Sequence, residues 1–230
     1  MIRVGHVILD VDGTLVDFDT ALRAALEATA GALSERLGTL VTPGGLRAAR
    51  ERVAAEPAWR GRRLREIRDE SFRRVIAQAG GDGAGNVGAL VAEALGVYYE
   101  ARDSALRPYP EVEAAVEALL GRGFTLVAAS NGNAALERLP VFRGFAHLHF
   151  AETAGVSKPD PRFFEGALAQ SGGRAGSAVS VGDRFENDYA PARALGMHAV
   201  LLDRSGSASD AALVRIRTLA DLPGLLEAAG

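Results

Sequence analysis

The feature that most constrains the fold of this chain is a series of short, continuously apolar segments separated by amphipathic ones. Buried strands are predicted at residues 4–11, 124–130, 177–183 and 198–203, with a weaker one at 147–152. Apolar runs without polar alternation are typical of parallel strands that are covered on both faces. Helical patterns separate them at 111–122, 134–139, 161–171 and 187–195. This alternation predicts an α/β fold, a doubly wound (Rossmann-like) parallel sheet.

One interval, from about residue 18 to residue 102, contains no convincing strand. Its apolar spacing is helical at 20–37, 45–55, 60–79 and 87–102. An insertion of this length between the first and second strands is too long for a simple crossover. We therefore expect a helical cap domain at residues 17–103, inserted into a catalytic core formed by residues 1–16 and 104–230.

Composition limits the kinds of partner. The net charge of −3 is unlike that of a general nucleic-acid binder, which is usually basic. The sequence has no cysteine, which excludes disulfides and thiolate metal sites and fits a reducing compartment. No segment resembles a signal peptide or approaches the roughly 18 apolar residues of a membrane helix. We expect a cytoplasmic protein that binds neither nucleic acid nor membrane; the oligomeric state is not predicted.

Acidic residues follow the first predicted strand. Asp10 and Asp12 are two positions apart, so that their side chains share one side of an extended backbone, and they precede Gly13 and Thr14. Ligands of open α/β sheets bind at the carboxyl ends of the strands. Two carboxylates there are unfavourable unless a cation joins them or one takes up a proton. On this pattern alone, a solvated turn explains the pair equally well.

Other strand ends carry polar residues as well. Ser130 ends the second strand, and the backbone N–H groups that follow it are suited to an anion. Asp183 lies at the end of a later strand, and Asp188 begins the next helix. Lys158, the only lysine among 26 basic residues, precedes another helix. Lysine presents a compact point charge where arginine presents a wide planar fork, which suits a crowded phosphate site.

These segments resemble the four motifs of the haloacid dehalogenase-like hydrolase superfamily, in its phosphatase branch with a helical C1 cap. The motifs are DVDGT at residues 10–14, Ser130 in ASNG, Lys158 in SKPDP, and GDRFEND at residues 182–188. The resemblance implies catalytic roles for Asp10, Asp12 and Lys158, Mg²⁺ binding by Asp10, the backbone carbonyl of Asp12, Asp183 and Asp188, and substrate binding by Thr14, Ser130, Asn131 and Gly132.

The function that this resemblance implies is Mg²⁺-dependent hydrolysis of a small phosphorylated metabolite through a phosphorylated Asp10. Asp12 favours a phosphatase over a dehalogenase, because the dehalogenase branch does not carry aspartate at this position and requires no metal. Two alternatives stay open: a sugar-phosphate mutase similar to β-phosphoglucomutase, and a non-enzymatic protein that binds a phosphorylated metabolite. The substrate itself is not predicted.

Two further patterns have competing interpretations. Residues 59–74 contain seven arginines, and Trp59, Arg65 and Arg68 could recognise an acidic substrate. Acidic residues interleave with these arginines at helical spacing, so we favour a solvated helix face. His147 and His149 could form a metal pair, but without a third ligand we interpret them as ordinary strand residues.

Overall fold

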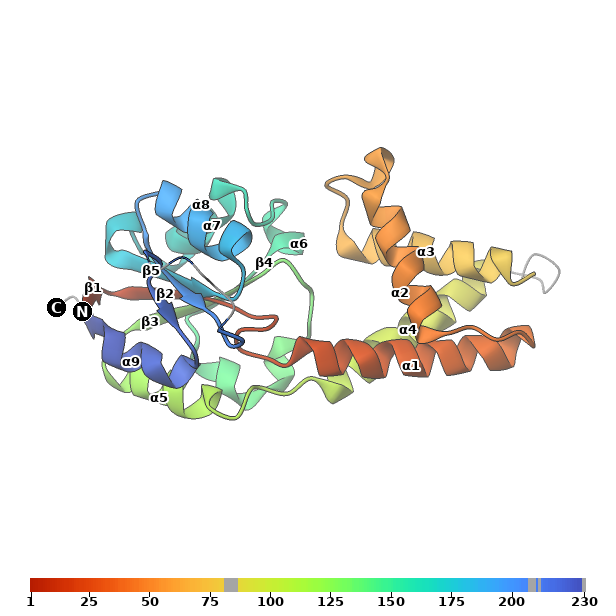
Figure 1. Cartoon of the computed structure of the whole chain (residues 1–230), viewed down its shortest axis with the longest axis horizontal. Coiled ribbons are helices and arrows are strands. Elements are labelled where there is room, and N and C mark those ends of the chain that lie inside the picture. Colours follow the sequence, from red (N-terminus) through yellow and green to blue (C-terminus); the bar gives the residue numbers. More distant parts are fainter. Residues whose placement is uncertain (81–86, 207–209, 211, 229–230) are drawn as a thin grey trace. The chain divides into compact units, whose positions relative to one another are not determined.

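A computed structural model describes residues 1–80, 87–206, 210 and 212–228 (Figure 1). The chain divides into two compact units, one of Met1–Asp17 with Arg107–Gly230 and the other of Phe18–Leu106.

The first unit is built on a six-stranded parallel sheet, which confirms the predicted doubly wound α/β fold. The strand order is β4-β3-β2-β5-β6-β7. The strands are β2 (His6–Asp10), β3 (Thr125–Ser130), β4 (His147–Phe150), β5 (Ala178–Gly182), β6 (His198–Leu202) and β7 (Arg215–Ile216). A separate parallel pair joins β1 (Ile2–Val4) to β8 (Leu226–Ala228).

The single strand predicted at residues 4–11 is in fact two strands, β1 and β2, in two different sheets. Gly5 separates them. Its N–H donates to the Ser177 carbonyl, and its carbonyl accepts from the Thr125 N–H, both at 2.9 Å. The predicted run starts at Val4, the last residue of β1, and a single glycine within an apolar run gives no clear signal of a break in the hydrophobic pattern.

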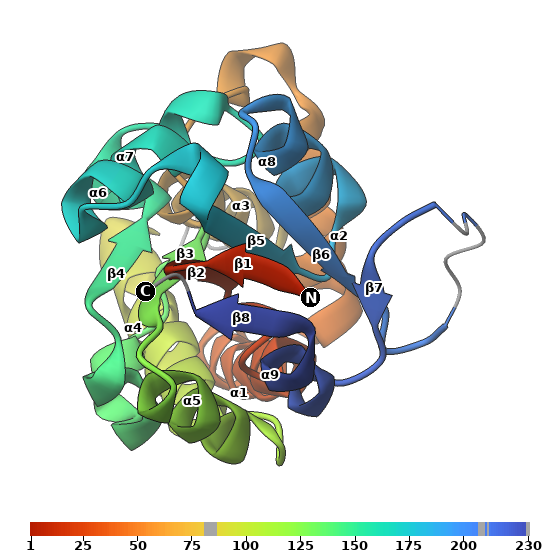
Figure 2. The same cartoon turned by 90° about the vertical axis from the view of Figure 1, so that its left-hand side faces the viewer.

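Helices cover both faces of the sheet (Figures 1 and 2). One face carries α5 (Val112–Gly121) and α9 (Leu222–Leu225), and the other carries α7 (Pro161–Ser171) and α8 (Ala190–Ala194). A short helix, α6 (Ala151–Ala154), follows β4 directly, so the weak strand is two residues shorter than predicted. The helix predicted at 134–139 is only a 3₁₀ turn at Leu136–Arg138, and a π-helical turn at Phe185–Tyr189 precedes α8.

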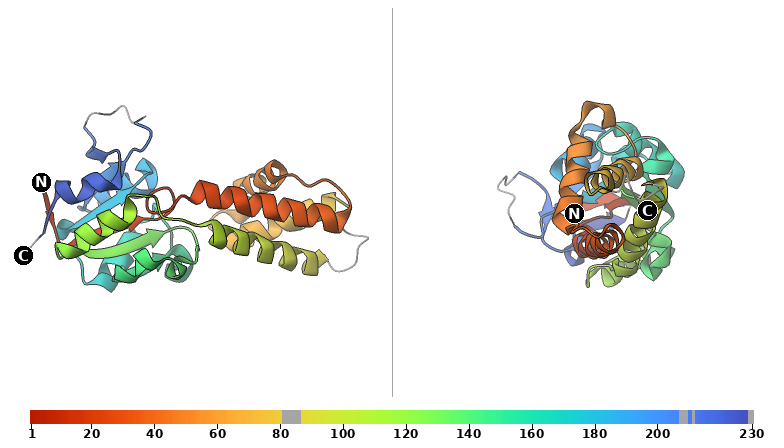
Figure 3. Two further views of the ribbon diagram at one scale, coloured as in Figure 1. Left: turned by 90° about the horizontal axis from the view of Figure 1, so that it is seen from below. Right: turned by 90° about the vertical axis from the view of Figure 1, so that its right-hand side faces the viewer.

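The second unit consists of α1 (Phe18–Leu37), α2 (Pro43–Ala55), α3 (Leu64–Gln78) and α4 (Val87–Ala105). Figure 3 shows α1 lying beside α4. The described part of this unit contains no strand, and its core includes Leu33, Leu46, Phe72 and Tyr98. Thr42 caps α2 by accepting the Gly45 N–H, with a proline in the first turn, a favourable helix start. Among the described residues, no helix is both long and apolar enough to cross a membrane.

The strand order determines where polar side chains meet. The central strand, β2, pairs with β3 on one side and with β5 on the other. Their carboxyl ends therefore reach one edge of the sheet, where Asp10, Ser130 and Gly182 are the final strand residues. The strand order runs outward from β2 through β3 and β4 on one side and through β5, β6 and β7 on the other. The point at which the order changes direction is the usual position of a ligand crevice.

Candidate active site

A buried lysine connects three segments at this edge. The Lys158 Nζ donates to Asp10 Oδ1 at 2.5 Å, to Asp188 Oδ1 at 2.7 Å and to the Ala129 carbonyl at 3.0 Å. Only 3% of the Lys158 side chain is exposed, so its ammonium group is fully committed to these acceptors. An ammonium group has three donors, and the three contacts use all of them.

The local charges are not balanced by this one cation. Burial disfavours the charged form of Lys158, but the carboxylates of Asp10 and Asp188 outweigh it and raise the pKa of the ammonium. Burial, with repulsion from Asp10, raises the pKa of Asp183 and raises that of Asp188 to about 6. Burial and the neighbouring carboxylate of Asp10 both disfavour the ionised forms of these acids, and the three carboxylates carry more negative charge than one ammonium offsets.

The surplus charge suits a divalent cation. Ligand atoms of Asp10, Asp183 and Asp188 lie within 4.8 Å of one another. The Asp183 Oδ1 is buried and accepts no hydrogen bond from the described residues. Carboxylate oxygens are ligands that Mg²⁺ prefers. Because buried polar atoms normally have a partner, a buried carboxylate oxygen that accepts no hydrogen bond is a suitable metal ligand. The residues present therefore fit the metal that the sequence predicts.

The turn after β2 presents Asp10 to the site. Gly13 has φ +85°, a left-handed conformation that favours glycine, and a Cβ added there would lie 2.5 Å from Asp183 Oδ2. The buried Thr14 donates from its hydroxyl to Asp10 Oδ2 at 3.1 Å. Thr14 and Lys158 thus hold one oxygen of Asp10 each, which restricts the orientation of its carboxylate.

Asp12 lies toward the segment after β3 rather than within the three-carboxylate group. A Cβ added at Gly132 would come within 2.8 Å of Asp12 Oδ2 and 3.0 Å of Ser130 Oγ. The Gly132 N–H donates to Ser130 Oγ at 2.8 Å. These predicted substrate-binding residues, at the end of β3, therefore lie together with Asp12, whereas Asp183 follows β5 on the other side of β2.

The side chain of Asn131 has a role that the sequence did not reveal. Its Nδ2 donates to the Lys158 carbonyl at 2.9 Å, and its Oδ1 accepts the Lys158 N–H at 2.8 Å. The side-chain amide of Asn131 thus pairs with both the N–H and the carbonyl of Lys158, and it holds the backbone from which the Lys158 side chain extends. The prediction gave Asn131 a phosphoryl contact through its backbone N–H, which stays a proposal.

Arg204 is a further residue that the sequence analysis missed. It donates from Nε to the Gly13 carbonyl at 3.2 Å, from Nη2 to the Thr14 carbonyl at 2.9 Å, and from Nη1 to Glu111 Oε1 at 2.6 Å. Its guanidinium also lies 3.8 Å from the ring centroid of Tyr109. Arg204 follows the end of β6, so the strand-end reasoning applied to the other residues could have found it.

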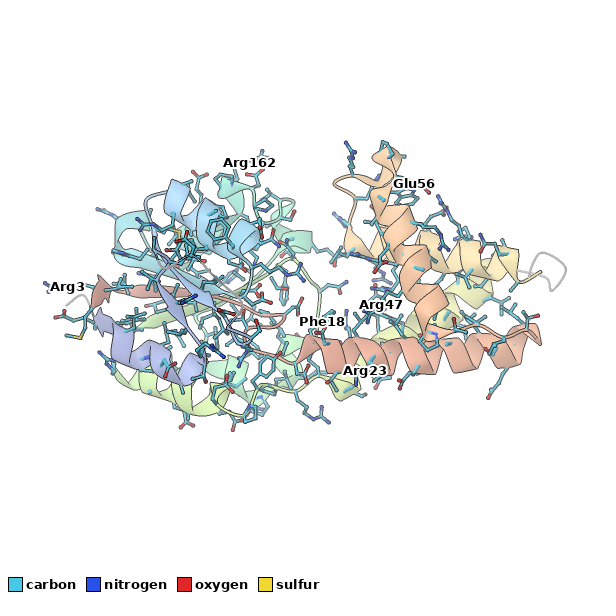
Figure 4. All side chains as sticks on the ribbon, in the orientation of Figure 1. Arg3, Phe18, Arg23, Arg47, Glu56 and Arg162 are labelled. Atoms are coloured by element: carbon cyan, nitrogen blue, oxygen red, sulfur yellow. The ribbon has the colours of Figure 1, made fainter. Side chains whose placement is uncertain are left out.

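The arginine-rich segment divides into two groups. The favoured interpretation, a solvated face, holds for arginines that pair with acidic neighbours: Arg62 with Glu66, Arg73 with Asp69, and Arg74 with Glu70 and Glu56. Figure 4 shows Glu56 at the end of α2. Arg65 and Arg68 instead lie over Tyr99 and Tyr98, at 5.8 and 4.0 Å from the ring centroids. Trp59 is half-buried in a separate 3₁₀ turn.

The two strand histidines form no metal pair with the acids. His149 is buried and its Nδ1 lies 2.7 Å from Gln170 Oε1, while burial lowers the pKa of its imidazole. The ring of His147 is 6.0 Å away. Within the described ranges, the one group of three potential metal-binding side chains is that of the aspartates.

Comparisons with known proteins agree with this arrangement. Residues 4–196 match the model of a hydrolase family, haloacid dehalogenase-like hydrolase. A glyceraldehyde 3-phosphate phosphatase from Methanopyrus kandleri is 35% identical over 50% of this chain, and a phosphoserine phosphatase from Thermus thermophilus is 37% identical over 66%. The crystal structure of a 2-haloacid dehalogenase from Pseudomonas syringae superimposes with a TM-score of 0.82, at 32% identity, covering 96% of this chain and 97% of that one.

The two phosphatases are matched only in part. The chain spans 52% of the length of the Methanopyrus protein and 59% of that of the Thermus protein. The names of the matched relatives describe two reactions, phosphate ester hydrolysis and dehalogenation. The names alone therefore do not decide the reaction, which depends on the residues of the site.

Proposed function

Because this chain belongs to the haloacid dehalogenase-like hydrolase family, we propose that it is a Mg²⁺-dependent phosphatase that hydrolyses a small phosphomonoester through a phosphorylated Asp10. The observation that carries the proposal is the imbalance of charge at the site, where three clustered carboxylates face one ammonium. A reaction that needs no cation gives no reason to gather Asp183 and Asp188 beside the nucleophile. The phosphatase names of the two matched relatives support the same choice.

In the proposed reaction, Asp10 is the nucleophile. One carboxylate oxygen attacks phosphorus and forms a new P–O bond, while the bond from phosphorus to the ester oxygen breaks. Lys158 and Thr14 hold the carboxylate in one orientation, which is a positioning contribution. Mg²⁺, held by Asp10, Asp183, Asp188 and the backbone carbonyl of Asp12, would supply positive charge that offsets the repulsion between carboxylate and phosphate.

Asp12 handles the proton in this proposal. It donates a proton to the leaving alkoxide in the first step and removes a proton from water in the second, when water attacks the phosphoryl group and frees Asp10. Its side chain lies beside Ser130 and Gly132, outside the three-carboxylate group, and would there face the leaving oxygen and the attacking water. Ser130 and the N–H groups of Asn131 and Gly132 would bind phosphoryl oxygens.

A mobile cap is part of the proposal. The helical unit at Phe18–Leu106 would serve as the cap, closing over the substrate and excluding water during the phosphoryl transfer. The substrates would be small phosphorylated metabolites in the cytoplasm, since those of the matched phosphatases are small by name.

The test is hydrolysis of p-nitrophenyl phosphate by the purified protein. We expect turnover that disappears with a chelator, returns with Mg²⁺, and is lost by at least about 10³-fold in Asp10→Asn while the circular dichroism spectrum is unchanged. Asp183→Asn should raise the Mg²⁺ concentration needed for half-maximal activity at least about tenfold. Full activity in Asp10→Asn would remove this residue from the nucleophile role.

Two assays separate the alternatives. Chloride release from a 2-haloacid without added metal, in the absence of phosphatase activity, would show a dehalogenase, the activity named for the matched crystal structure. Isomer formation without free phosphate, measured on sugar phosphates, would show a mutase. Metal-dependent turnover of any phosphate ester would exclude a protein that only binds its ligand.

A further inference from the structure

A surface hollow lies beside the last strand of the six-stranded sheet, and it shares no lining residue with the three-carboxylate group. Its volume is about 530 Å³, which is within the range of small-molecule sites. All of its lining residues belong to the first unit, and they come from the segment after β6, from β7 and from the segment that leads into α9. Figure 2 shows β7 next to β6, on the side of the sheet opposite to β4.

An arginine of this hollow lies against the backbone of a glycine. Gly206 has φ +71°, and a Cβ added to it would overlap the guanidinium of Arg217. The guanidinium thus occupies space that only a glycine leaves open. Arg217 forms no hydrogen bond or ion pair with the residues that the structure describes. Its five N–H donors are therefore available to a ligand.

A carboxylate on the same hollow is also unpaired. Asp221 has no side-chain partner in the described part of the chain, and it forms no ion pair with Arg217, four positions earlier. The other lining acid, Asp203, is buried and accepts the Gly206 N–H at 2.7 Å and the Ser205 hydroxyl at 3.2 Å. Single exposed charges are common, but two opposite charges that line one hollow without meeting can be bridged by a ligand that carries both.

Hydrogen bonds connect this hollow to the turn after β2. Leu219, which lies between the two unpaired charges in the sequence, donates its backbone N–H to the carboxylate of Glu111. Arg204 donates to the same carboxylate at 2.6 Å and also to the carbonyls of Gly13 and Thr14. A ligand that orders residues 217–221 would therefore also order the support of the turn that carries the proposed nucleophile.

We propose that the hollow binds a small zwitterion, with its carboxylate on Arg217 and its ammonium group on Asp221, and that this binding raises turnover at Asp10. The planar fork of a guanidinium matches a carboxylate, and an aspartate accepts the N–H donors of an ammonium group. The effect on turnover rests on the proposed function, whereas the binding of the zwitterion does not.

The binding test uses ω-amino acids from glycine to 6-aminohexanoate, which differ in the distance between carboxylate and ammonium. Arginine Nε–Hε resonances of the whole, metal-free protein are followed by NMR during each titration. At the best length, we expect a saturable shift of the Arg217 resonance, with a Kd at least about fivefold lower than for the alkylamine and the alkanoate of equal length. No saturable shift, or equal Kd values for the singly charged compounds, would overturn the inference.

Two neutral variants isolate the two charges. Arg217→Gln and Asp221→Asn change exposed residues, and each should raise the Kd at least about fivefold while the circular dichroism spectrum is unchanged. The amide resonance of Gly206 reports binding where Arg217 is absent. Arg174→Gln changes an exposed arginine that does not line the hollow, and it should keep the wild-type Kd. A Kd that is unchanged in both neutral variants, or that rises equally in Arg174→Gln, contradicts the site.

The kinetic test measures p-nitrophenyl phosphate hydrolysis at saturating Mg²⁺ with and without the best ω-amino acid. We expect the ligand to raise kcat at least about twofold in the wild type and to have no effect in Arg217→Gln. A wild-type protein that binds the ligand with unchanged kcat would refute the effect on turnover. A protein that binds the ligand but hydrolyses no phosphate ester would refute the proposed function and support the binding site.

Discussion

The Nζ of Lys158 lies 2.5 Å from Asp10 Oδ1, although the two residues are 148 positions apart in the sequence. The same ammonium group contacts Asp188 and the Ala129 carbonyl, and Asn131 holds the backbone of Lys158 on both sides. One cation thus joins the nucleophile proposed on β2 to the acid beyond β5. Its position depends on the order of the strands.

Replacing Lys158 with arginine should inactivate the enzyme. The guanidinium fork is wider than the ammonium group, and a side chain with 3% exposure leaves no room for it between two carboxylates. We expect kcat for p-nitrophenyl phosphate to fall at least about 10²-fold, although the charge is kept. Arg162→Lys, at an exposed residue labelled in Figure 4, should keep full activity. A Lys158→Arg variant with wild-type kcat would show that charge alone suffices.

Two glycines with the same φ angle allow a matched comparison at the turn after β2. Gly13 and Gly123 both have φ +85°, but an added Cβ would meet Asp183 Oδ2 at 2.5 Å in the first case and open space in the second. We expect Gly123→Ala to lower the free energy of unfolding by about 1–2 kcal/mol through strain alone. Gly13→Ala should cost about 1–3 kcal/mol more.

The same pair also separates stability from activity. Gly13→Ala should weaken Mg²⁺ activation, because the methyl group displaces the carboxylate of Asp183, whereas Gly123→Ala should keep its Mg²⁺ dependence. Urea unfolding and Mg²⁺ titration of p-nitrophenyl phosphate hydrolysis provide the two measurements. Equal losses in both variants would mean that Asp183 moves aside without consequence.

Arg204→Lys tests whether the guanidinium positions the turn that carries the nucleophile. Lysine can reach one of the two carbonyls of Gly13 and Thr14, but it cannot hold both together with Glu111. Because Arg204 contacts the turn and not the carboxylate of Asp10, we expect kcat to fall roughly 10- to 100-fold with KM nearly unchanged. A loss of stability with unchanged kcat would make Arg204 a structural residue only.

The stability of the metal-free protein should decrease as the pH rises from 4 to 7. The folded-state pKa of Asp188 is raised to about 6 from an ordinary 3.8, so between these values the folded state binds more protons than the unfolded state. Stability from this group is therefore greatest at low pH and is lost through pH 6, by up to about 3 kcal/mol. The raised pKa of Lys158 has no effect in this window, because its ammonium is protonated in both states.

Asp188→Asn isolates this contribution, since it keeps the shape of the side chain and removes the titration. Urea unfolding at several pH values in the presence of a chelator should give a shallower slope for the variant than for the wild type. Saturating Mg²⁺ should reduce the wild-type slope, because the cation stabilises the ionised carboxylates. Identical slopes in the two metal-free proteins would contradict the raised pKa.

Much of the core could be predicted from the sequence. Continuous apolar runs identified the parallel strands, and the rule that ligands bind at their carboxyl ends selected Asp10, Ser130 and Asp183. These inferences depend on local periodicity, which a sequence contains directly. They failed where periodicity gives no signal, as at Gly5, where one apolar run belongs to two sheets.

By itself, the sequence determined which chemical groups stand at the ends of the strands and that the interval from about residue 18 to residue 102 has helical patterns and no convincing strand. Only the tertiary structure decided their partners: Lys158 between Asp10 and Asp188, Arg204 on the Gly13 and Thr14 carbonyls, and Arg68 on a tyrosine and not on an acid. The physical reason is that a side chain's partner depends on strand order and on the way helices pack. Residues more than a hundred positions apart become neighbours through these long-range arrangements, which no local pattern records.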